Sequence, residues 1–369
     1  MIPCIALDAM SGDYGPPVVV PAALQVLSTI ENVHLILVGD EKLLTQAVGQ
    51  QPAKIIQRLS IYHANQRVEM DELPAHALRN KKDSSMRVAI NLVKQGKAEA
   101  CVSAGNTGAL MATARYVLKM LPGIDRPAII TALPNMLGTC THVLDLGANV
   151  DASPEHLFQF AVMGTVLAQA VDNLANPRIG LLNIGQEDMK GNERVKKANQ
   201  LLVSSPINYI GFVEGDDIYK GTVDVVVCDG FVGNVSLKTT EGVAKMISHY
   251  VKQSFNKNLW TRFAGLLALP IIKNIRQKID PRRYNGASLL GLRGIVIKSH
   301  GSADILSFTY AIKEAIIEVQ KNVPAQISNQ LATLLTEKRE EVIVEIASTR
   351  PTPMTNQLTG LLNEKRCVG

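Results

Sequence analysis

The chain has 369 residues, of which 46% are hydrophobic and only 4% aromatic, and it carries a formal net charge of +5. Its five cysteines are scattered without a Cys-x-x-Cys pair, and no apolar run approaches the roughly 20 residues that span a bilayer. These features argue against a disulfide framework, a zinc or other metal site, and a membrane-spanning helix; the polar start of the chain does not fit a signal peptide. We expect a cytoplasmic α/β protein with a sizeable core.

The basic charge is concentrated in one segment. Between residues 245 and 283, nine Lys and Arg residues stand against the single acidic Asp280, a local net charge of +8. The rest of the chain therefore carries −3. The basic character belongs to this segment and not to the fold as a whole.

Short apolar runs that end in Gly, Asp or Asn predict the strands of a parallel sheet. In chain order they cover residues 5–7, 33–38, 59–63, 98–102, 128–133, 141–149, a run from 179, 209–214 and 224–228, with one more strand within 286–304. Helices are expected over residues 16–30, 154–172 and 308–322, and after the loops at 40 and 103–108. Ligands of such sheets bind beyond the carboxyl ends of the strands.

The pattern predicts a doubly wound α/β/α fold with a mostly parallel sheet and a protruding helical hairpin. We expect one catalytic domain over residues 1–345, which divides into two lobes, 1–134 with 296–345 and 135–295. The hairpin covers residues 239–283. A loose tail without periodicity covers residues 346–369.

The clearest anion-binding pattern lies at residues 224–238. An apolar run stops at Asp229 and Gly230, and Gly233 with Asn234 predicts a turn before a helix that begins at Val235. A strand, a glycine loop and a helix start place free backbone N–H groups around a small anion, and phosphate is the expected guest. Loops 8–13 and 103–108 repeat this arrangement, with spacing that matches neither the dinucleotide fingerprint nor a Walker loop.

The stretch from residue 81 to 87 combines cations and hydroxyls and has two interpretations. One is an exposed helix start capped by Asp83 or Ser84. The other is a second contact for an anionic ligand.

The segment 239–283 reads as two helices with a break near residues 265–270. Apolar and basic side chains gather around this break: Trp260, Phe263, Leu266, Leu267 and Leu269, with Lys257, Arg262 and Lys273. Such a mixture suits the surface of an anionic membrane. A dimer contact and an ordinary core helix pair with a basic rim are the alternatives, and nucleic acid fits least because stacking aromatics are scarce.

Seven ordered motifs resemble the PlsX family, the acyl carrier protein:phosphate acyltransferases. They are Asp8-Ala9-Met10-Ser11-Gly12-Asp13, Ser103-Ala104-Gly105-Asn106-Thr107-Gly108-Ala109, Leu144-Asp145-Leu146-Gly147-Ala148-Asn149, Leu182-Asn183-Ile184-Gly185 with Glu187 and Lys190-Gly191, Gly211-Phe212-Val213-Glu214-Gly215, Asp229-Gly230-Phe231-Val232-Gly233-Asn234 and His300-Gly301-Ser302. Ser11 departs from the family, which usually has glycine there. The resemblance covers residues 1 to about 330.

The resemblance implies transfer of a long-chain acyl group from the carrier-protein thioester to inorganic phosphate, without a cofactor. The product is an acyl phosphate, which a downstream glycerol-phosphate acyltransferase consumes in phospholipid synthesis. The fold implied is related to phosphate acetyltransferase and isopropylmalate dehydrogenase. Members of the family are commonly homodimers and associate peripherally with the membrane.

Phosphate is itself an oxygen nucleophile, so the chemistry needs alignment, oxyanion stabilisation and help for the departing thiolate. For that help we predict Lys190 or His300, together with Asn234; a surface ion pair of Lys190 with Glu187 or Asp188, and a structural histidine, are the alternatives. The predicted phosphate and substrate contacts are Ser103, Gly105, Asn106, Thr107, Gly108, Asp8, Gly12, Asp13, Asn149, Asn183, Gly185, Glu187, Asp229, Gly230 and Gly233.

Three competing functions follow from the same residues. A short-chain phosphate acyltransferase that uses coenzyme A is the nearest. An NAD-dependent dehydrogenase of related fold lacks support, since the dinucleotide fingerprint is missing from the sequence. A non-catalytic, membrane-docked scaffold for lipid enzymes is the third.

Overall fold

The computed structural model describes residues 2–333, apart from the side chains of residues 275–279 and 281. The tail predicted at 346–369 lies outside these residues. The strands are β1 Cys4–Asp8, β2 His34–Gly39, β3 Leu59–His63, β4 Ala100–Ser103, β5 Ala128–Pro134, β6 Cys140–Leu144, β7 Ile179–Leu182, β8 Tyr209–Val213, β9 Val225–Val227, β10 Ala287–Leu290 and β11 Ile295–Lys298.

The helices match the expected positions in most places. They are α1 Pro16–Thr29, α2 Glu41–Val48, α3 Ala53–Ile56, α4 Pro74–Asn80, α5 Ser85–Lys94, α6 Thr107–Leu118, α7 Pro154–Val171, α8 Glu193–Val203, α9 Asp217–Lys220, α10 Gly230–Phe255, α11 Leu259–Ile279 and α12 Ile305–Lys321, with a 3-10 turn at Pro281–Tyr284. At α5 the Ser84 hydroxyl accepts from the Arg87 amide, which confirms the capping interpretation of that stretch.

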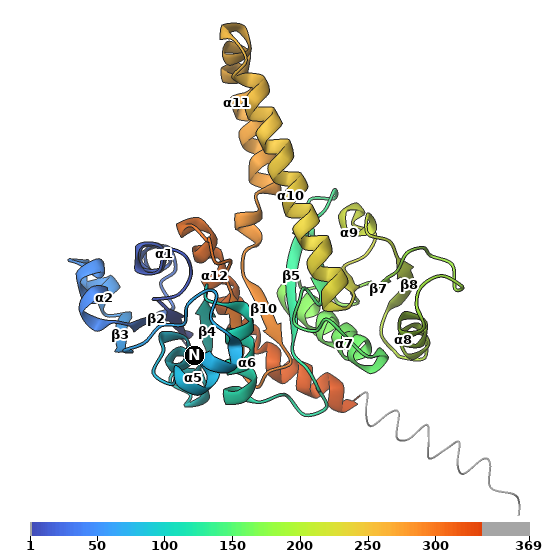
Figure 1. Ribbon diagram of the computed structural model, residues 1–369, viewed down its shortest axis with the longest axis horizontal. Coiled ribbons are helices and arrows are strands. Elements are labelled where there is room, and N and C mark those ends of the chain that lie inside the picture. The colour runs from blue at the N-terminus through green and yellow to red at the C-terminus, as the bar shows by residue number, and fades with distance from the viewer. Residues whose placement is uncertain (1, 334–369) are drawn as a thin grey trace, which may run out of the picture.

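Within the described residues, the strands form one eleven-stranded sheet in the order β3-β2-β1-β4-β11-β10-β5-β6-β9-β7-β8. Helices cover it on both sides (Figure 1). Strands such as β4 and β9 are buried along their whole length, which explains their apolar, β-branched sequences. The predicted α/β fold with a mostly parallel sheet is confirmed. The division into two lobes stays a prediction.

The centre of the sheet is antiparallel. β10 runs antiparallel to both β11 and β5, and β5 runs antiparallel to β6. β1 and β4 therefore run in one direction, while β6, β9 and β7 run in the other. The carboxyl ends of β1 and β4 therefore lie at the opposite end of the strands from those of β6, β9 and β7. The expectation that the loops after all these strands meet on one side of the sheet is wrong.

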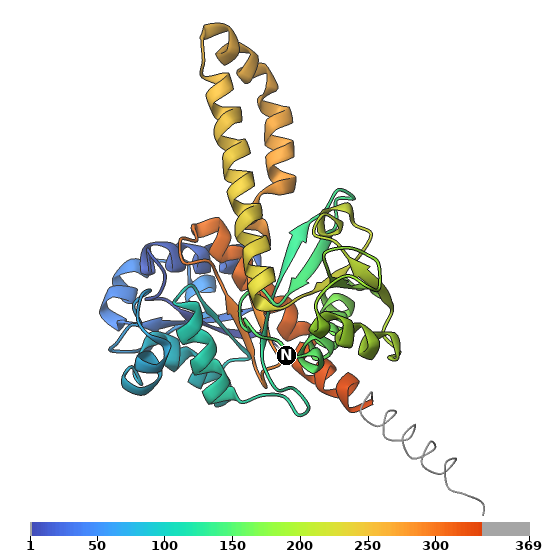
Figure 2. The ribbon, with the colours of Figure 1, turned by 45° about the vertical axis from the view of Figure 1, so that its right-hand side comes forward.

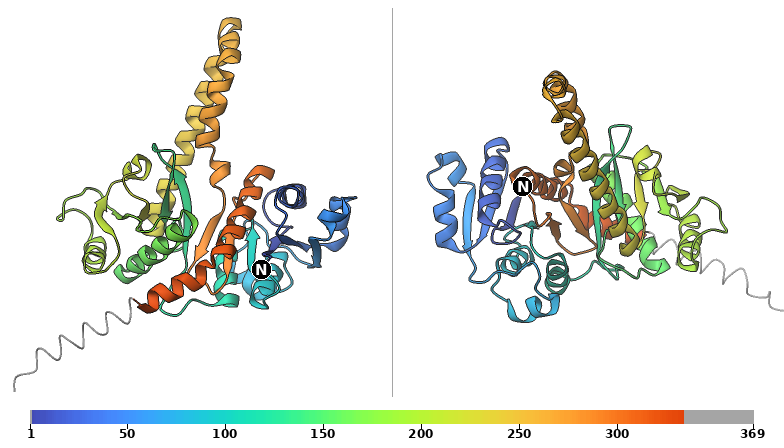
Figure 3. Two further views of the ribbon diagram at one scale, coloured as in Figure 1. Left: turned by 180° about the vertical axis from the view of Figure 1, so that it is seen from behind. Right: turned by 45° about the horizontal axis from the view of Figure 1, so that its top comes forward.

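The long hairpin of α10 and α11 projects away from the body of the molecule in every view (Figures 2 and 3). Its predicted break near residues 265–270 is wrong, because the turn lies at residues 256–258. Asn258 accepts from the Thr261 amide and begins α11 with a capping box. Gly265 instead packs on Phe255, where an added Cβ would lie 2.9 Å from the ring. No helix of the described residues is long and apolar enough to cross a membrane.

Two further boundaries differ from the sequence prediction. The strand expected over 141–149 ends at Leu144, and α10 begins at Gly230 and not at Val235. Gly233 therefore lies in the first turn of a helix. A Cβ at Gly233 would lie 1.9 Å from the carbonyl oxygen of Asp145, so glycine is needed for helix packing and not for a turn.

Candidate functional site

A buried carboxylate lies at the carboxyl end of β1. Asp8 Oδ2 accepts hydrogen bonds from Ser11 Oγ at 2.5 Å and from Ser103 Oγ at 2.6 Å, and Ser103 lies at the end of the adjacent β4. Burial raises the pKa of Asp8, while these hydroxyls act in the opposite direction. We call Asp8, Ser11, Ser85, Ser103 and Lys298 the Asp8 cluster.

Lys298 is the last residue of β11 and pairs in register with Ser103. Its side chain is only 9% exposed. The ammonium donates to the carbonyl oxygen of Ala104 at 3.3 Å and to that of Ser299. Burial lowers the pKa of Lys298 to about 8, against the attraction of Asp8 and Asp13.

Two polar atoms of this cluster are buried without a hydrogen bond among the described residues. They are Asp8 Oδ1 and Ser85 Oγ. The Ser85 hydroxyl is close enough to help lower the pKa of Asp8, although no hydrogen bond of normal geometry joins them. Since buried polar groups are usually bonded to protein or water, this spot has unused capacity to bind a polar atom.

The loops after β1, β4 and β11 are tied closely together. The Asp13 amide donates to the Gly301 carbonyl oxygen at 2.9 Å, and the Ser299 amide donates to that of Ser103. Gly12 has a φ of 84°, and a Cβ there would lie 2.9 Å from that of Ala104. A side chain at this position would force the loops apart, so glycine is required.

His300 follows directly on this edge and is exposed. Its Nδ1 lies 2.9 Å from Ser302 Oγ and accepts from the Ser302 amide at 3.2 Å, which leaves Nε2 for a ligand. Partial burial and the positive charge of Lys238 on α10 lower the pKa of His300. Lys238 also lowers the pKa of Lys298, and Glu241 and Lys245 act on His300, so the third to fifth turns of α10 lie within electrostatic range of these residues.

The predicted contacts at the start of α6 have structural partners. Asn106 accepts from the Ala109 amide as the helix cap, and its side-chain amide donates to the carbonyl oxygens of Met70 and Glu72. The first amides of α6, at Thr107 and Gly108, have no partner within the helix. A ligand here would meet main-chain N–H groups in preference to the Asn106 side chain.

A second group of predicted residues surrounds Asp145, which follows β6. Asp145 accepts from the amides of Ile129, Ala148 and Asn149 and from the Asn149 side chain. The Asn149 side chain also donates to the Pro127 carbonyl oxygen, and the Asp229 carboxylate caps α10. Asn149, Asp229, Gly230 and Gly233 thus have structural partners, while Asn234 is exposed beside Gly147.

A third group lies in the loop after β7. Lys190 Nζ pairs with Glu187 at 2.9 Å, and the two side chains are 45% and 61% exposed. The ion pair raises the pKa of Lys190 and lowers that of Glu187. Asn183 donates to the Lys190 carbonyl oxygen at 3.2 Å, and the charged end of Lys190 folds over Gly185. The surface ion pair of Lys190 with Glu187, one of the alternatives considered from the sequence, is therefore present.

The three groups do not form one compact cluster. β4 and β9 lie five strand positions apart, about 24 Å along the sheet, and run in opposite directions. The structure brings Asp8, Gly12, Asp13, Ser103, Gly105 and His300 together. The Lys190 and Asp145 groups follow other strands, and Asn234 lies on α10 one turn before Lys238. α10 is the link, because it begins in the second group and reaches the first at Lys238.

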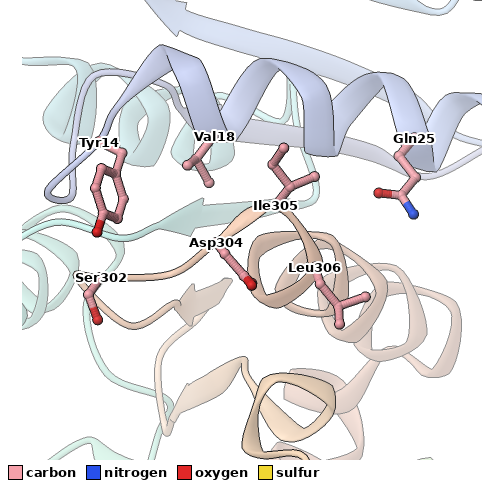
Figure 4. Close-up of a pocket in the computed structure, with 7 residues that line it drawn as sticks. All are labelled: Tyr14, Val18, Gln25, Ser302, Asp304, Ile305 and Leu306. Atoms are coloured by element: carbon pink, nitrogen blue, oxygen red, sulfur yellow. The ribbon is translucent and has the colours of Figure 1, made fainter. Parts of the chain in front are cut away.

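A groove of about 600 Å³ lies beside the His300 loop, between α1 and the start of α12 (Figure 4). Its lining residues are Tyr14, Val18, Gln25, Ser302, Asp304, Ile305 and Leu306. Its carboxylate, Asp304, already pairs with Arg282 at 2.8 Å and caps α12 through Ser307. The groove therefore adds no free charged group to the candidate site.

Sequence reasoning gave no role to Lys298 or Lys238; Ser11 was noted only as a departure from the family, and Ser85 lies in the 81–87 stretch for which an anion contact was one interpretation. The signal for Lys298 was present, since a lone lysine ends the apolar run Ile295-Val296-Ile297 just before the Ser-His-Gly loop. Lys238 gave no such signal: on a helix it is one cation among many, and only the path of α10 brings it to the site.

The sequence matches the family described as "Fatty acid synthesis protein" over residues 4–326. It is 63% identical over 333 residues to the "Phosphate acyltransferase" of Nitrosococcus oceani, which covers 90% of this chain and 98% of that protein. The protein of the same name from Alkalilimnicola ehrlichii is 60% identical over 334 residues, with 90% and 97% covered.

Among solved structures, the fold is similar to that of a phosphotransacetylase from Streptococcus pyogenes. The TM-score is 0.57 at 17% identity, over 87% of this chain and 94% of that one. At this level of identity the likeness concerns the fold alone, and it agrees with the mixed α/β sheet described above.

Proposed function

Since the chain belongs to the PlsX family of phosphate acyltransferases, enzymes of fatty acid and phospholipid synthesis, we propose that it transfers a long-chain acyl group from acyl carrier protein to inorganic phosphate. A phosphate oxygen attacks the thioester carbonyl carbon, the C–S bond breaks, and the thiolate takes up a proton. The products are an acyl phosphate and free carrier protein. A glycerol-phosphate acyltransferase downstream consumes the acyl phosphate.

One observation carries this proposal: a buried lysine lies among the glycine loops at the carboxyl ends of β1, β4 and β11. This lysine is Lys298; His300, whose pKa is lowered, follows it in the chain, and Lys238 of α10 acts on both electrostatically. The first amides of α6, at Thr107 and Gly108, lack partners within the helix and together with these lysines suit a phosphate dianion, while the Gly105 amide already donates to Ser103 Oγ at 3.1 Å. We place phosphate against Ser103, Gly105, Thr107 and Gly108, with Asn106 fixing the start of α6.

Charge that develops on the thioester oxygen and the leaving sulfur needs a donor. His300 is the nearer candidate to the proposed phosphate site, because its Nε2 is free and the loop that bears it contacts loop 8–13. Lys190 and Asn234 lie in the other groups. Contact of these two residues with the substrate stays a prediction, as it does for Asn149, Asn183, Gly185, Glu187, Asp229, Gly230 and Gly233.

The assay is incubation of the purified protein with long-chain acyl carrier protein and phosphate, with free thiol as the readout. Phosphate-dependent thiol release supports the proposal. The control is the same buffer without phosphate, and without arsenate, which could replace phosphate as the acyl acceptor. The same assay with short-chain coenzyme A thioesters tests the alternative reaction. Tight carrier-protein binding with no acyl phosphate formed would instead support a scaffold.

For the removal of the leaving group, Lys190→Ala and His300→Gln separate two hypotheses. A loss of kcat in His300→Gln with near-normal turnover in Lys190→Ala would assign proton transfer to the histidine. The reverse result would assign it to Lys190, and normal turnover in both would leave thiolate departure to solvent.

The hairpin exposes two apolar surfaces that we assign to different partners. On α10, Val243, Met246, Ile247, Tyr250 and Val251 are all exposed and follow helical spacing, which suits a second copy of the chain. At the end of the hairpin Trp260 is 83% exposed, near Lys257 and Arg262. Trp260, Phe263, Leu266, Leu267 and Leu269, with Lys273, suit an anionic membrane, so we propose a cytoplasmic homodimer that associates peripherally with it.

Two variants test this assignment independently. Ile247→Glu should shift the sedimentation profile from dimer to monomer. Trp260→Glu should abolish flotation with vesicles that contain anionic lipid and leave the dimer intact. Loss of the dimer in Trp260→Glu would contradict the assignment of the dimer contact to α10 and of the membrane contact to the end of the hairpin.

A further inference from the structure

Lys298 occupies a place that burial alone makes unfavourable for a cation. Its ammonium has three N–H donors, and two of them bond the carbonyl oxygens of Ala104 and Ser299. The third has no protein acceptor among the described residues. The two acceptors belong to different loops, one after β4 and one after β11, so the side chain bridges the loops that adjoin the proposed phosphate site.

The charged groups around Lys298 come from every neighbouring element. Asp8 on β1 and Asp13 in the following loop attract it, while Lys238 on α10 repels it. His300, two residues along its own chain, feels its charge in turn. None of the carboxylates lies within 4.0 Å of the ammonium in a described ion pair, so Lys298 is not neutralised by direct contact.

The unpaired atoms of the cluster point to the same spot. Asp8 Oδ1 and Ser85 Oγ are buried without hydrogen bonds, beside a lysine with an unused donor. An ordinary structural lysine would be expected to end in a complete set of partners. Here Lys298 keeps an unused donor, and Asp8 Oδ1 and Ser85 Oγ remain unpaired, at the end of the strands where a ligand is proposed.

We propose that Lys298 is a positioning residue of the phosphate site: its charged ammonium holds loop 103–108 against the loop after β11, so that the first amides of α6, at Thr107 and Gly108, face the phosphate. The inference rests on the proposed function. Lys298 is then the cation on which phosphate binding depends, and it lies outside the sequence motifs.

The charge of Lys298 then makes phosphate binding sensitive to alkaline pH. Burial lowers the pKa of Lys298 to about 8, so the ammonium loses its proton in a range where exposed lysines keep theirs. The neutral amine bonds the two carbonyls more weakly and offers no charge to the dianion. Phosphate binding should therefore weaken above this pH, while binding of the acyl donor changes little.

The experiment measures phosphate affinity by calorimetry and KM by thiol release, from pH 6 to pH 10. In the wild type we expect the KM for phosphate to rise at least tenfold toward the alkaline end, with a steady KM for the acyl carrier protein. Lys298→Met should raise the KM for phosphate at least tenfold at pH 7 and lose this alkaline rise. Lys298→Arg should restore part of the affinity and keep it at high pH, since guanidinium stays charged.

Lys94→Met is the matched control, because this lysine is exposed at the end of α5. It removes the same charge and should leave the KM for phosphate unchanged at every pH. The melting temperature adds a readout that a purely structural role would move. For Lys298→Met at pH 7 we expect a modest fall, because the carbonyl oxygens of Ala104 and Ser299 lose their donor, so the KM for phosphate and its pH dependence decide the role.

A wild-type KM for phosphate without any alkaline rise would overturn the proposal, even if no Lys298 variant folds. So would a Lys298→Met protein that loses stability and kcat but keeps its phosphate affinity. If no acyl donor releases thiol, the proposed function fails. Calorimetry with phosphate alone still tests Lys298 in that case, so the two failures are distinguishable.

Discussion

Two of the regions that bury a carboxylate each leave two polar atoms unpaired among the described residues. The Asp8 cluster leaves Asp8 Oδ1 and Ser85 Oγ, and a second region leaves His142 Nδ1 and Glu318 Oε1. In the second region, Ser288 of β10 donates to Glu318 Oε2 at 3.1 Å, and His142 of β6 pairs with Asp172 at 2.6 Å. We call this the Glu318 cluster.

The neighbours of the two clusters differ more than their burial does. Burial and nearby Glu314 raise the pKa of Glu318, which lies on α12 against the middle of the sheet. The Asp8 cluster lies at strand ends, between glycine loops, with a lysine in reach. Burial of an acid is therefore a poor guide to function by itself. The presence of a cation and of open loop amides separates the two regions.

The largest expected effect is that of Asp8→Asn. It should lower kcat/KM about 100-fold, or about 2.7 kcal/mol, because the carboxylate orients Ser11 and Ser103 and balances the charge of Lys298. Steady-state kinetics and thermal unfolding measure it. Glu318→Gln is the matched control for loss of a buried carboxylate and should keep kcat/KM within about twofold. Equal losses in the two variants would remove the distinction between the clusters.

The next effect concerns stability. Because the pKa of Glu318 is raised in the folded protein, the folded state holds a proton that the unfolded chain loses. The free energy of unfolding therefore falls as pH rises from about 4.3, the ordinary value of Glu, toward the raised value. Glu318→Gln removes this loss. It should raise the melting temperature at pH 8 by about 2–4 °C, or about 1 kcal/mol, and by less at pH 5.

A wild-type melting temperature that does not fall between pH 5 and pH 8 relative to Glu318→Gln would contradict this. It would mean that Glu318 finds a partner, such as water, for its second oxygen and ionises normally.

The sequence predicted the strands well because each is a short apolar run that ends at Gly, Asp or Asn. It could not predict the reversal of direction at β10, because both orientations of a buried strand have the same pattern. That reversal places the loops after β7 and β9 at the other end of the strands from the loop after Ser103. Motifs along the chain therefore identified strand ends correctly without revealing which ends share an edge.

The start of α10 shows the same limit at the scale of one residue. Glycine at 233 suggested a turn, since turns need glycine more often than helices do. The real requirement is the close approach of the Asp145 carbonyl oxygen, a contact between residues 88 positions apart that no local pattern encodes. Asp8, Gly12, Asp13 and His300 were found because they lie within motifs; Lys298 lies just outside one.

An effect of similar size is expected at Ser288, the hydroxyl donor to Glu318. Ser288→Ala leaves the carboxylate with less compensation for its burial and should lower the free energy of unfolding by about 1 kcal/mol. In the Glu318→Gln background the loss should be smaller, because a neutral amide depends less on this bond. Urea unfolding of the four proteins measures the coupling. A drop in the phosphate affinity of Ser288→Ala would show that the Glu318 cluster also contributes to ligand binding.

The last effect, of similar size, distinguishes the two kinds of unpaired atom most directly. If the Ser85 hydroxyl only marks imperfect packing, Ser85→Ala should stabilise the protein by up to about 1 kcal/mol and leave the KM for phosphate unchanged. If it serves a ligand, as we expect, the same change should raise that KM about fivefold, which corresponds to about 1 kcal/mol. Ser84→Ala is the control, since this hydroxyl caps α5 and should affect stability alone. A stabilised Ser85→Ala enzyme with normal phosphate affinity would give Ser85 the same purely structural role as Glu318. The difference between the Asp8 cluster and the Glu318 cluster would then depend on Lys298 and the loops.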